Sequence, residues 1–427
     1  MSDPIIDFSS LDAELADLRT APHWYLGFSG GVDSTALLHL LTRWRRANPD
    51  APALTAIHIN HGMQSAADEW QVHCEWVCRM LRVPLISRRV TVSSDPGGSE
   101  AAARQARYRV FEELVQAKEV LFLGHHLDDQ VETYFLRLLR GAGVQGLAAM
   151  PARRKLDHGL LARPLMQITR EQLLAYTEAQ GLTCIEDPSN SDTAMDRNFL
   201  RAELLPLLAK RWPGYRRTVS RASEHMAVAA AALDELLPAP ATVYSSFGDP
   251  GVRLEDLDGS AEAAAVKLRS WLQSGGMQAP DQAALEEFLR QLREAADDAA
   301  PRLQCSAYSL QRYRGAVYRL PEALGYVPPE SLNMLPGEVY EVPGVGRVAL
   351  DATDGPGLRL EDGQALELAW RSGGERCHPV GRAGSNSLKK LLQEADVPPW
   401  WRDRVPLLSL EGELLEVGGL WLCESTR

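Results

Sequence analysis

The chain has 427 residues, of which 45% are apolar and 24% charged, a composition that excludes whole-chain disorder, collagen-like repeats and a disulfide-stapled miniprotein. Its formal net charge of −12, if evenly spread, would repel nucleic acid and anionic membranes. No apolar run is long enough to span a membrane and the N-terminus does not resemble a secretory signal, so we expect a cytoplasmic protein. The six scattered cysteines predict reduced thiols rather than a disulfide framework.

Charge is unevenly distributed along the chain. Residues 234–298 contain thirteen acidic and five basic side chains, whereas residues 197–221 contain seven basic side chains and one acidic. The basic block is suited to holding phosphates, although a solvated helix face would have the same composition.

The first half of the chain alternates strand-like and helical segments. Apolar runs at 24–28, 54–59, 84–92 and 120–123 are each followed by a segment with helical periodicity, which predicts an α/β fold with a parallel sheet and flanking helices. In such sheets, ligands bind beyond the carboxyl ends of the strands. Further along, Thr169 and Gln172 predict a capping box for a helix that runs to Gln180, and Asp196 predicts the cap of the helix that carries the basic block.

The second half has a different character. Helical spacing at 226–237, 261–273 and 281–296 predicts a helical domain, and a Pro/Gly-rich passage predicts a linker or short strands. A small α+β unit follows, with a strand at 367–371, a helix at 386–395 and strands near Leu407 and Leu420. The predicted domains are 1–217 (nucleotide-binding and catalytic), 218–320 (helical), 321–356 (linker) and 357–427 (C-terminal).

The most informative motif is the run Ser29-Gly-Gly-Val-Asp-Ser34, which follows the first strand and opens a helix. Several backbone N–H groups converge at such a helix N-terminus, and they form a cradle for anions. The dipeptide Gly-Lys is absent from the chain, so the motif is not a Walker A loop. The alternative is a strand-to-helix turn with small residues for packing.

This motif resembles the PP-loop of the N-type ATP pyrophosphatases, which implies the adenine-nucleotide alpha-hydrolase-like fold. Further segments together resemble the tRNA(Ile)-lysidine synthetase family, over about residues 20–215 and again in the C-terminal unit. These segments are 57–62, 100–108, 123–133, 137–143, 186–190, 197–201, 373–376, 379–382, 388–394 and 398–400.

The resemblance implies a two-step reaction. ATP adenylates the O2 of the first anticodon cytidine of tRNA(Ile) with a CAU anticodon, and the ε-amine of free lysine then displaces AMP. The implied cofactors are ATP and Mg²⁺, with Asp33 helping to place the ion. The implied nucleotide-binding residues are Ser29, Gly30, Gly31, Val32, Asp33, Ser34 and His58.

The chemistry requires a carboxylate near the amine, because a lysine side chain has a pKa of about 10.4 in solution and is mostly protonated at neutral pH. Asp129 and Glu132 are candidates, since they lie three residues apart at the start of a predicted helix and share one face. Acidic residues in a first helical turn also complement the helix dipole, which is the alternative role. Arg104 is a candidate contact of the α-phosphate or the intermediate, or a member of a structural ion pair.

Binding a polyanion to an acidic protein requires separate basic surfaces, and the resemblance supplies two. The predicted tRNA contacts are Arg137, Arg140, Arg197 and Arg201 beside the reaction centre, and Arg376, Arg382, Lys389 and Lys390 on the C-terminal unit. The helical domain 218–320 and the C-terminal domain 357–427 are both expected to contact tRNA. The oligomeric state stays open, with a homodimer among the options.

Two other functions compete with this prediction. A base 2-thiolase of the same class would need a catalytic cysteine pair or an iron–sulfur site near the nucleotide, and Cys74 and Cys78 are the one pair close in sequence. Their helical spacing favours buried thiols over a zinc site. A non-catalytic ATP-binding module would need neither Asp129 and Glu132 nor two further domains.

Overall fold

The computed structural model describes residues 6–62, 66–90, 99–187, 194–296, 299–322, 331–342, 344–351, 353–355, 357–361, 363–382 and 384–424, with the backbone alone for 99–101. Within the motifs, Asn190 and the side chain of Glu100 lie outside this part of the chain, as do linker residues 323–330. Two compact units divide the chain, Met1–Ala232 and Leu233–Arg427. No helix in the described residues is long and apolar enough to cross a membrane.

The N-terminal unit contains a six-stranded sheet in the order β3-β2-β1-β4-β6-β5. Its strands are β1 (His23–Gly27), β2 (Ala53–Asn60), β3 (Leu85–Arg89), β4 (Val120–Phe122), β5 (Arg153–Leu156) and β6 (Gly159–Ala162). All neighbouring pairs are parallel except β5 with β6. The four predicted strands and the parallel sheet are thus confirmed. Because the chain moves outward from β1 to β3 and then returns to β4, the strand order switches between β1 and β4, where open sheets of this type bind ligands.

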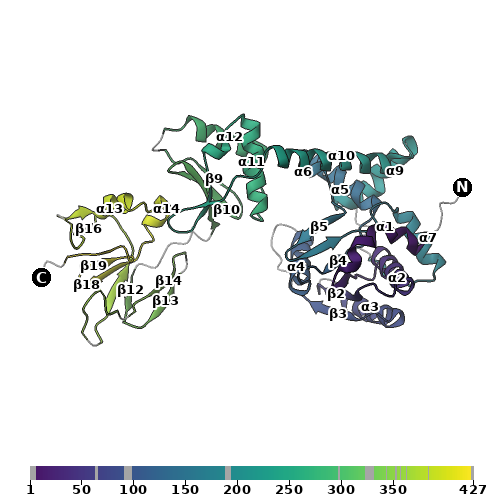
Figure 1. The fold of residues 1–427 in the computed structure, drawn as a ribbon, viewed down its shortest axis with the longest axis horizontal. Helices are drawn as coiled ribbons and strands as arrows, with labels where there is room; N and C mark the ends of the chain where they lie inside the picture. The colour runs from purple at the N-terminus through teal and green to yellow at the C-terminus, as the bar shows by residue number, and fades with distance from the viewer. Residues whose placement is uncertain are drawn as a thin grey trace. The chain divides into compact units, whose positions relative to one another are not determined.

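Helices cover both faces of this sheet. On one face α2 (Val32–Ala47), α3 (Ala67–Leu81) and α7 (Arg170–Ala179) enclose a core that includes Trp24, Trp44 and Tyr176, while α4 (Ser99–Leu114) covers the other face. Figure 1 shows α2 and α4 on opposite sides of the strands. The Thr169–Gln172 capping box is present at the start of α7, as predicted. Short turns precede β1, at Phe8–Leu11, Asp12–Leu15 (α1) and Ala16–Thr20.

A second layer of helices lies at the carboxyl edge of the sheet. It comprises α5 (Leu127–Leu139), α6 (Val144–Leu147), α8 (Asp196–Phe199), a π-helical turn (Leu200–Leu204), α9 (Leu205–Arg211) and α10 (Tyr215–Leu236). The basic block therefore spans several helices, and the predicted cap is wrong: Asp196 is the first residue of α8, and Met195 occupies the cap position. The boundary predicted after residue 217 falls inside α10.

The first part of the C-terminal unit differs from the helical domain expected. It does contain the predicted helices α11 (Ala261–Ser274) and α12 (Gln282–Glu294), but they pack on an antiparallel sheet in the order β7-β8-β11-β10-β9. Its strands are β7 (Val243–Tyr244), β8 (Pro250–Arg253), β9 (Arg302–Gln304), β10 (Tyr308–Tyr313) and β11 (Ala316–Pro321). A 3-10 turn at Glu255–Leu257 lies between β8 and α11. These strands are short and their apolar and polar residues alternate irregularly, so the sequence pattern predicts the two periodic helices but not the strands.

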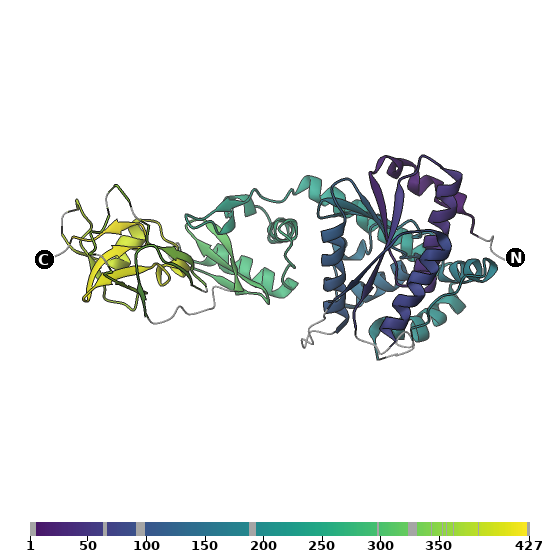
Figure 2. The same ribbon diagram turned by 90° about the horizontal axis from the view of Figure 1, so that it is seen from below.

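The last part of the chain forms a second antiparallel sheet, in the order β12-β15-β18-β19-β20. Its strands are β12 (Ser331–Met334), β15 (Leu366–Ala369), β18 (Leu407–Leu410), β19 (Glu413–Val417) and β20 (Trp421–Leu422). Two separate antiparallel pairs are β13 (Val339–Val342) with β14 (Gly346–Ala349) and β16 (Arg376–Cys377) with β17 (Asn386–Ser387). The helices of this part are α13 (Leu388–Glu394) and α14 (Pro399–Arg402). In Figure 2 these strands lie at the yellow end of the chain. The Pro/Gly-rich passage is predicted to form either a linker or short strands, and its described residues contribute the strands β12, β13 and β14.

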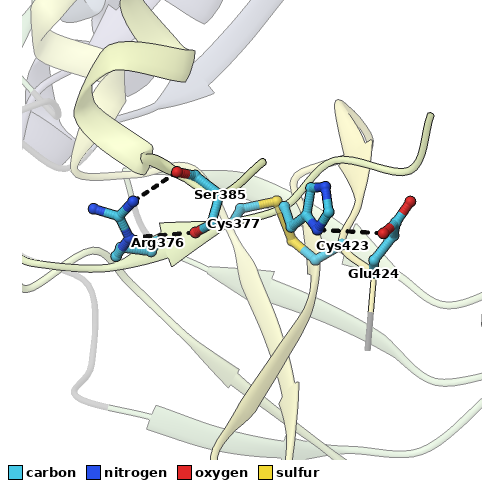
Figure 3. The surroundings of a disulfide bond; sticks show 6 residues. Arg376, Cys377, Ser385, Cys423 and Glu424 are labelled. Carbon is cyan, nitrogen blue, oxygen red and sulfur yellow. Dashed lines mark hydrogen bonds and ion pairs between the residues drawn. A yellow bond between two sulfur atoms is a disulfide. The ribbon is translucent and has the colours of Figure 1, made fainter. Parts of the chain in front are cut away.

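Two cysteines are bonded, contrary to the expectation of reduced thiols throughout. Cys377 and Cys423 form a disulfide with their Cα atoms 5.5 Å apart, and four other cysteines are free. Backbone pairing between Pro379 and Cys423 brings the two segments together across 46 residues of sequence, which spacing alone does not reveal. Figure 3 shows the bond beside Arg376 and Glu424.

Candidate active site at the carboxyl edge of the sheet

The predicted phosphate loop connects β1 to α2. Gly30 adopts a positive φ of 82°, and a Cβ there would lie 2.5 Å from Ile185, so this position requires glycine. The Oγ atoms of Ser29 and Ser34 are 3.1 Å apart, and the Ser34 hydroxyl also donates to the Gly31 carbonyl. These bonds fold the loop back over the first turn of α2, and phosphate binding by its N–H groups stays a prediction.

His58 supports this loop from β2. Its Nδ1 lies 3.0 Å from the carbonyl oxygen of Phe28, so that nitrogen must carry the hydrogen. The ring is buried, and burial lowers the pKa of His58. One ring nitrogen of His58 thus hydrogen-bonds the backbone next to the phosphate loop. Contact between His58 and the nucleotide stays a prediction.

The turn after β4 meets the phosphate loop. A Cβ on Gly124 would lie 3.1 Å from the backbone of Asp33, a tight contact that glycine avoids. His126 follows, fully buried, with Nε2 3.5 Å from carboxylate oxygens of both Asp33 and Asp129. Burial acts to lower the pKa of His126, but the surrounding carboxylates raise it above its ordinary value. His126 therefore links the loop to the first turn of α5.

Asp129 and Glu132 share a face of α5, as predicted, but differ in their contacts. One oxygen of Asp129 accepts the N–H of His126, which closes a capping box. Glu132 is fully buried and accepts two hydrogen bonds from Arg201, at 2.8 and 3.0 Å. Arg197 lies 3.4 Å from the same carboxylate.

The other predicted cations beside the centre also have protein contacts. Arg137 donates to the carbonyls of Gly146 and Ala149, both at 2.8 Å, and so holds the turn after α5. Arg140 is exposed and paired with Asp196. The guanidinium of Arg104 lies 5.0 Å from the centre of the Tyr108 ring. For all three, contact with tRNA or nucleotide stays a prediction.

The four predicted cations of the C-terminal unit lie around α13. Arg376 donates to Ser385, Arg382 pairs with Glu394, and Lys390 lies 3.9 Å from Glu394. Lys389 is exposed on the same helix. β16 pairs with β17, which leads directly into α13, so the structure brings these residues to one region.

Sequence reasoning missed residues whose role depends on contacts between distant segments. His126 and Gly124 stand in a motif that the sequence analysis quoted, but nothing in their spacing shows that they touch the phosphate loop. Asp249 is buried and accepts hydrogen bonds from the indoles of Trp400 and Trp401, at 3.0 and 2.8 Å. Both indole N–H groups are thus engaged within the C-terminal unit.

The residues present fit a magnesium ion. Asp33 Oδ1 is buried and makes no hydrogen bond among the described residues, with His126 Nε2 at 3.5 Å, and it lies beside the predicted phosphate cradle. The described residues contain no group of three His, Cys, Asp or Glu side chains arranged for a metal. Mg²⁺ commonly binds through one or two carboxylates together with substrate phosphates, which matches this arrangement.

Comparison with known proteins follows the same division of the chain. Residues 7–208 match the family model described as the PP-loop domain, so the N-terminal unit is a PP-loop domain of the ATP-using class. Residues 259–318 match the TilS substrate binding domain, and residues 366–427 match the TilS substrate C-terminal domain.

Full-length relatives identify the family. The tRNA(Ile)-lysidine synthase of Coxiella burnetii is 38% identical over 96% of this chain and 91% of its own length. That of Pseudomonas syringae pv. tomato is 42% identical over 95% of this chain and 90% of its own. The chain therefore belongs to the tRNA(Ile)-lysidine synthase family, and it is an ATP-dependent ligase that forms a C–N bond.

Proposed function

We propose that this chain adenylates the O2 of the wobble cytidine of tRNA(Ile) with a CAU anticodon, and then joins the ε-amine of free lysine to C2 of that base. The observation that carries the proposal is the meeting of Asp33 and Asp129 at His126. It supports placing the phosphate loop and the carboxylates of α5 around one reaction centre, at the switch between β1 and β4.

In the first step the cytidine oxygen attacks the α-phosphorus, and the bond to pyrophosphate breaks. N–H groups of the Ser29–Ser34 loop would stabilise the charge that develops on the leaving pyrophosphate, as donors at a helix N-terminus do. Asp33 would hold Mg²⁺, which when bound neutralises charge on the phosphates. Ser29 and Ser34 would bind phosphate oxygens, and Arg104 the α-phosphoryl group.

In the second step the lysine amine attacks C2, the C2–O bond breaks, and AMP leaves with that oxygen. The amine must lose protons, and we assign Asp129 as the group that contacts it. Glu132 already accepts two hydrogen bonds from Arg201, whereas the second oxygen of Asp129 lies 3.9 Å from the nearest nitrogen of Arg201. Glu132 then acts by holding Arg201 and Arg197 beside the centre.

The tRNA would contact the two basic regions. Arg140 is exposed at the end of α5, and Lys389 and Lys390 are exposed on α13. Exposed cations of this kind can replace their surface ion pairs with phosphate contacts at little cost, because such pairs contribute only about 0–1 kcal/mol.

The thiolase alternative lacks a reactive cysteine pair. Cys74 and Cys78 are buried on α3, and burial raises the pKa of each thiol to about 12. Thiols with so high a pKa are protonated at neutral pH and are poor nucleophiles.

Incubating the chain with tRNA transcript, labelled lysine and ATP·Mg tests the proposal. We expect pyrophosphate and AMP in equal amounts, with label in a modified cytidine after nucleoside analysis. Omitting tRNA should abolish both products. Turnover that depends on a sulfur donor, or pyrophosphate release without tRNA, would contradict the assignment.

A further inference from the structure

Arg163 follows β6 and reaches across to the end of β4. Its side chain is buried, with the residue 3% exposed. Nη1 donates to the Pro151 carbonyl at 2.6 Å, and Nε lies 3.3 Å from Nδ1 of His125. No motif in the sequence analysis includes this arginine, and the steps above give it no role.

The contact determines where the hydrogen of His125 lies. A guanidinium has donors but no acceptor, and it stays charged in proteins. His125 Nδ1 must therefore accept, which leaves the single hydrogen on Nε2 and makes the ring neutral. Burial, together with Arg163, Arg104 and Arg107, lowers the pKa of His125 to about 3 against the opposing effect of Asp129.

His125 stands at the reaction centre. It separates Gly124, which packs on the Asp33 backbone, from His126, which contacts Asp33 and Asp129. His125 is half-buried, and no described hydrogen bond involves Nε2. The Nε2–H group is thus left for a ligand, while Nδ1 is occupied by protein.

We infer that Arg163 is a positioning residue that fixes His125 as a neutral hydrogen-bond donor, directed at an acceptor atom of the bound nucleotide or base. This inference rests on the proposed function for the identity of those substrates. One consequence concerns the lysine amine: His125 has no lone pair left to accept its proton, so that role falls to Asp129.

Nuclear magnetic resonance of protein labelled with ¹⁵N in histidine tests the tautomer directly, with the His125→Gln spectrum assigning the signals. In the wild type we expect an unprotonated Nδ1 and a protonated Nε2 from pH 6 to pH 8. Arg163→Met should give signals averaged between tautomers, and Arg163→Lys, which keeps a charged donor, should restore the wild-type pattern in part. Arg154→Met is the matched control, since Arg154 lies over the Tyr108 ring at 4.9 Å and has no described contact with His125.

Activity supplies the second readout. Arg163→Met should lower kcat for lysine transfer by at least about tenfold, with KM for ATP changed less than about twofold, because the donor acts on the reacting groups. A wild-type His125 with its hydrogen on Nδ1, or an Arg163→Met spectrum like the wild type, would overturn the inference. If the His125 tautomer is as expected but lysine is never transferred, the proposed function is wrong, whereas the inference that Arg163 keeps the hydrogen of His125 on Nε2 still holds.

Discussion

Asp129 and Glu132 lie one helical turn apart on α5, yet their carboxylates have different surroundings. The sequence gives them equivalent positions, because spacing determines a shared face and nothing more. Burial and the bidentate contact with Arg201 then distinguish Glu132 from Asp129, which keeps partial exposure. Arg201 and Arg197 both lie against the buried Glu132 carboxylate, which leaves it poorly placed to contact the lysine amine as well, so we assign that contact to Asp129.

Glu132→Gln should leave nucleotide binding intact but reduce lysine transfer by about 100-fold or more, because loss of the charge releases Arg201 and Arg197 from the centre. Calorimetry with a non-hydrolysable ATP analogue measures nucleotide binding, and incorporation of labelled lysine into the tRNA measures the transfer. Glu203→Gln is the control, since Glu203 is an exposed acid of the same basic block. Turnover close to wild type in Glu132→Gln would remove this carboxylate from the mechanism.

The residues of the site differ in how far the sequence predicts them. The Ser29–Ser34 loop and Asp129 follow from local patterns, since a strand, a glycine turn and a helix start are contiguous. His126, Gly124 and Arg163 owe their roles to contacts between the turns after β1, β4 and β6. Such contacts depend on strand order, which one sequence does not determine.

At the scale of elements, Asp128 joins three helices. It belongs to α5, accepts the N–H of Arg170 at the start of α7, and pairs with Arg216 of α10 at 2.5 Å. Burial acts to raise the pKa of Asp128, but these two partners lower it below its ordinary value. A carboxylate with a lowered pKa stabilises the folded state at neutral pH and loses that contribution as the pH falls through its folded pKa.

Asp128→Asn should therefore destabilise the α5–α10 contact by about 1–3 kcal/mol at pH 7, and by less as the pH falls below the ordinary value of 3.8. Hydrogen exchange of peptides from α5 and α10, compared with wild type at each pH, measures the difference. The matched control is Asp196→Asn, which breaks an exposed pair with Arg140 and should have an effect of at most about 0.5 kcal/mol. An equal loss of stability at pH 7 and below pH 3.8 would refute the electrostatic explanation.

Asp249 connects the β7–β8 sheet to α14 in the C-terminal unit. Besides the two indoles it accepts a hydrogen bond from Ser245, at 2.6 Å. We expect Asp249→Ala to leave both indole N–H groups without an acceptor, at a cost of about 1–3 kcal/mol, and to increase hydrogen exchange in α14. Ser246→Ala, which removes a more exposed contact with Asp396, is the milder comparison. Unchanged exchange in α14 would show that apolar packing, such as Phe247 on Trp401, is sufficient there.

Across the whole molecule, a net charge of −12 coexists with a polyanionic substrate. Residues 234–298 hold much of the acidic excess, while the cations around α13 are exposed. The total charge has the same sign as the tRNA backbone and repels it, but at physiological salt this repulsion is screened beyond about 8 Å. Local basic regions must provide the affinity, and each phosphate contact then releases counterions.

Salt dependence of tRNA binding tests this distribution of charge. The affinity should fall steeply with salt, and Lys389→Ala with Lys390→Ala should reduce the slope of log K against log salt by about 1.4–1.8, since each lost contact removes about 0.7–0.9. Lys155→Ala removes an exposed lysine of β5 that has no predicted tRNA role, and it should leave the slope unchanged. Filter binding over a range of salt concentrations gives the slopes. If the double variant and the control have the same slope, α13 does not contact phosphates, and the tRNA must be held by the cations near α5 instead.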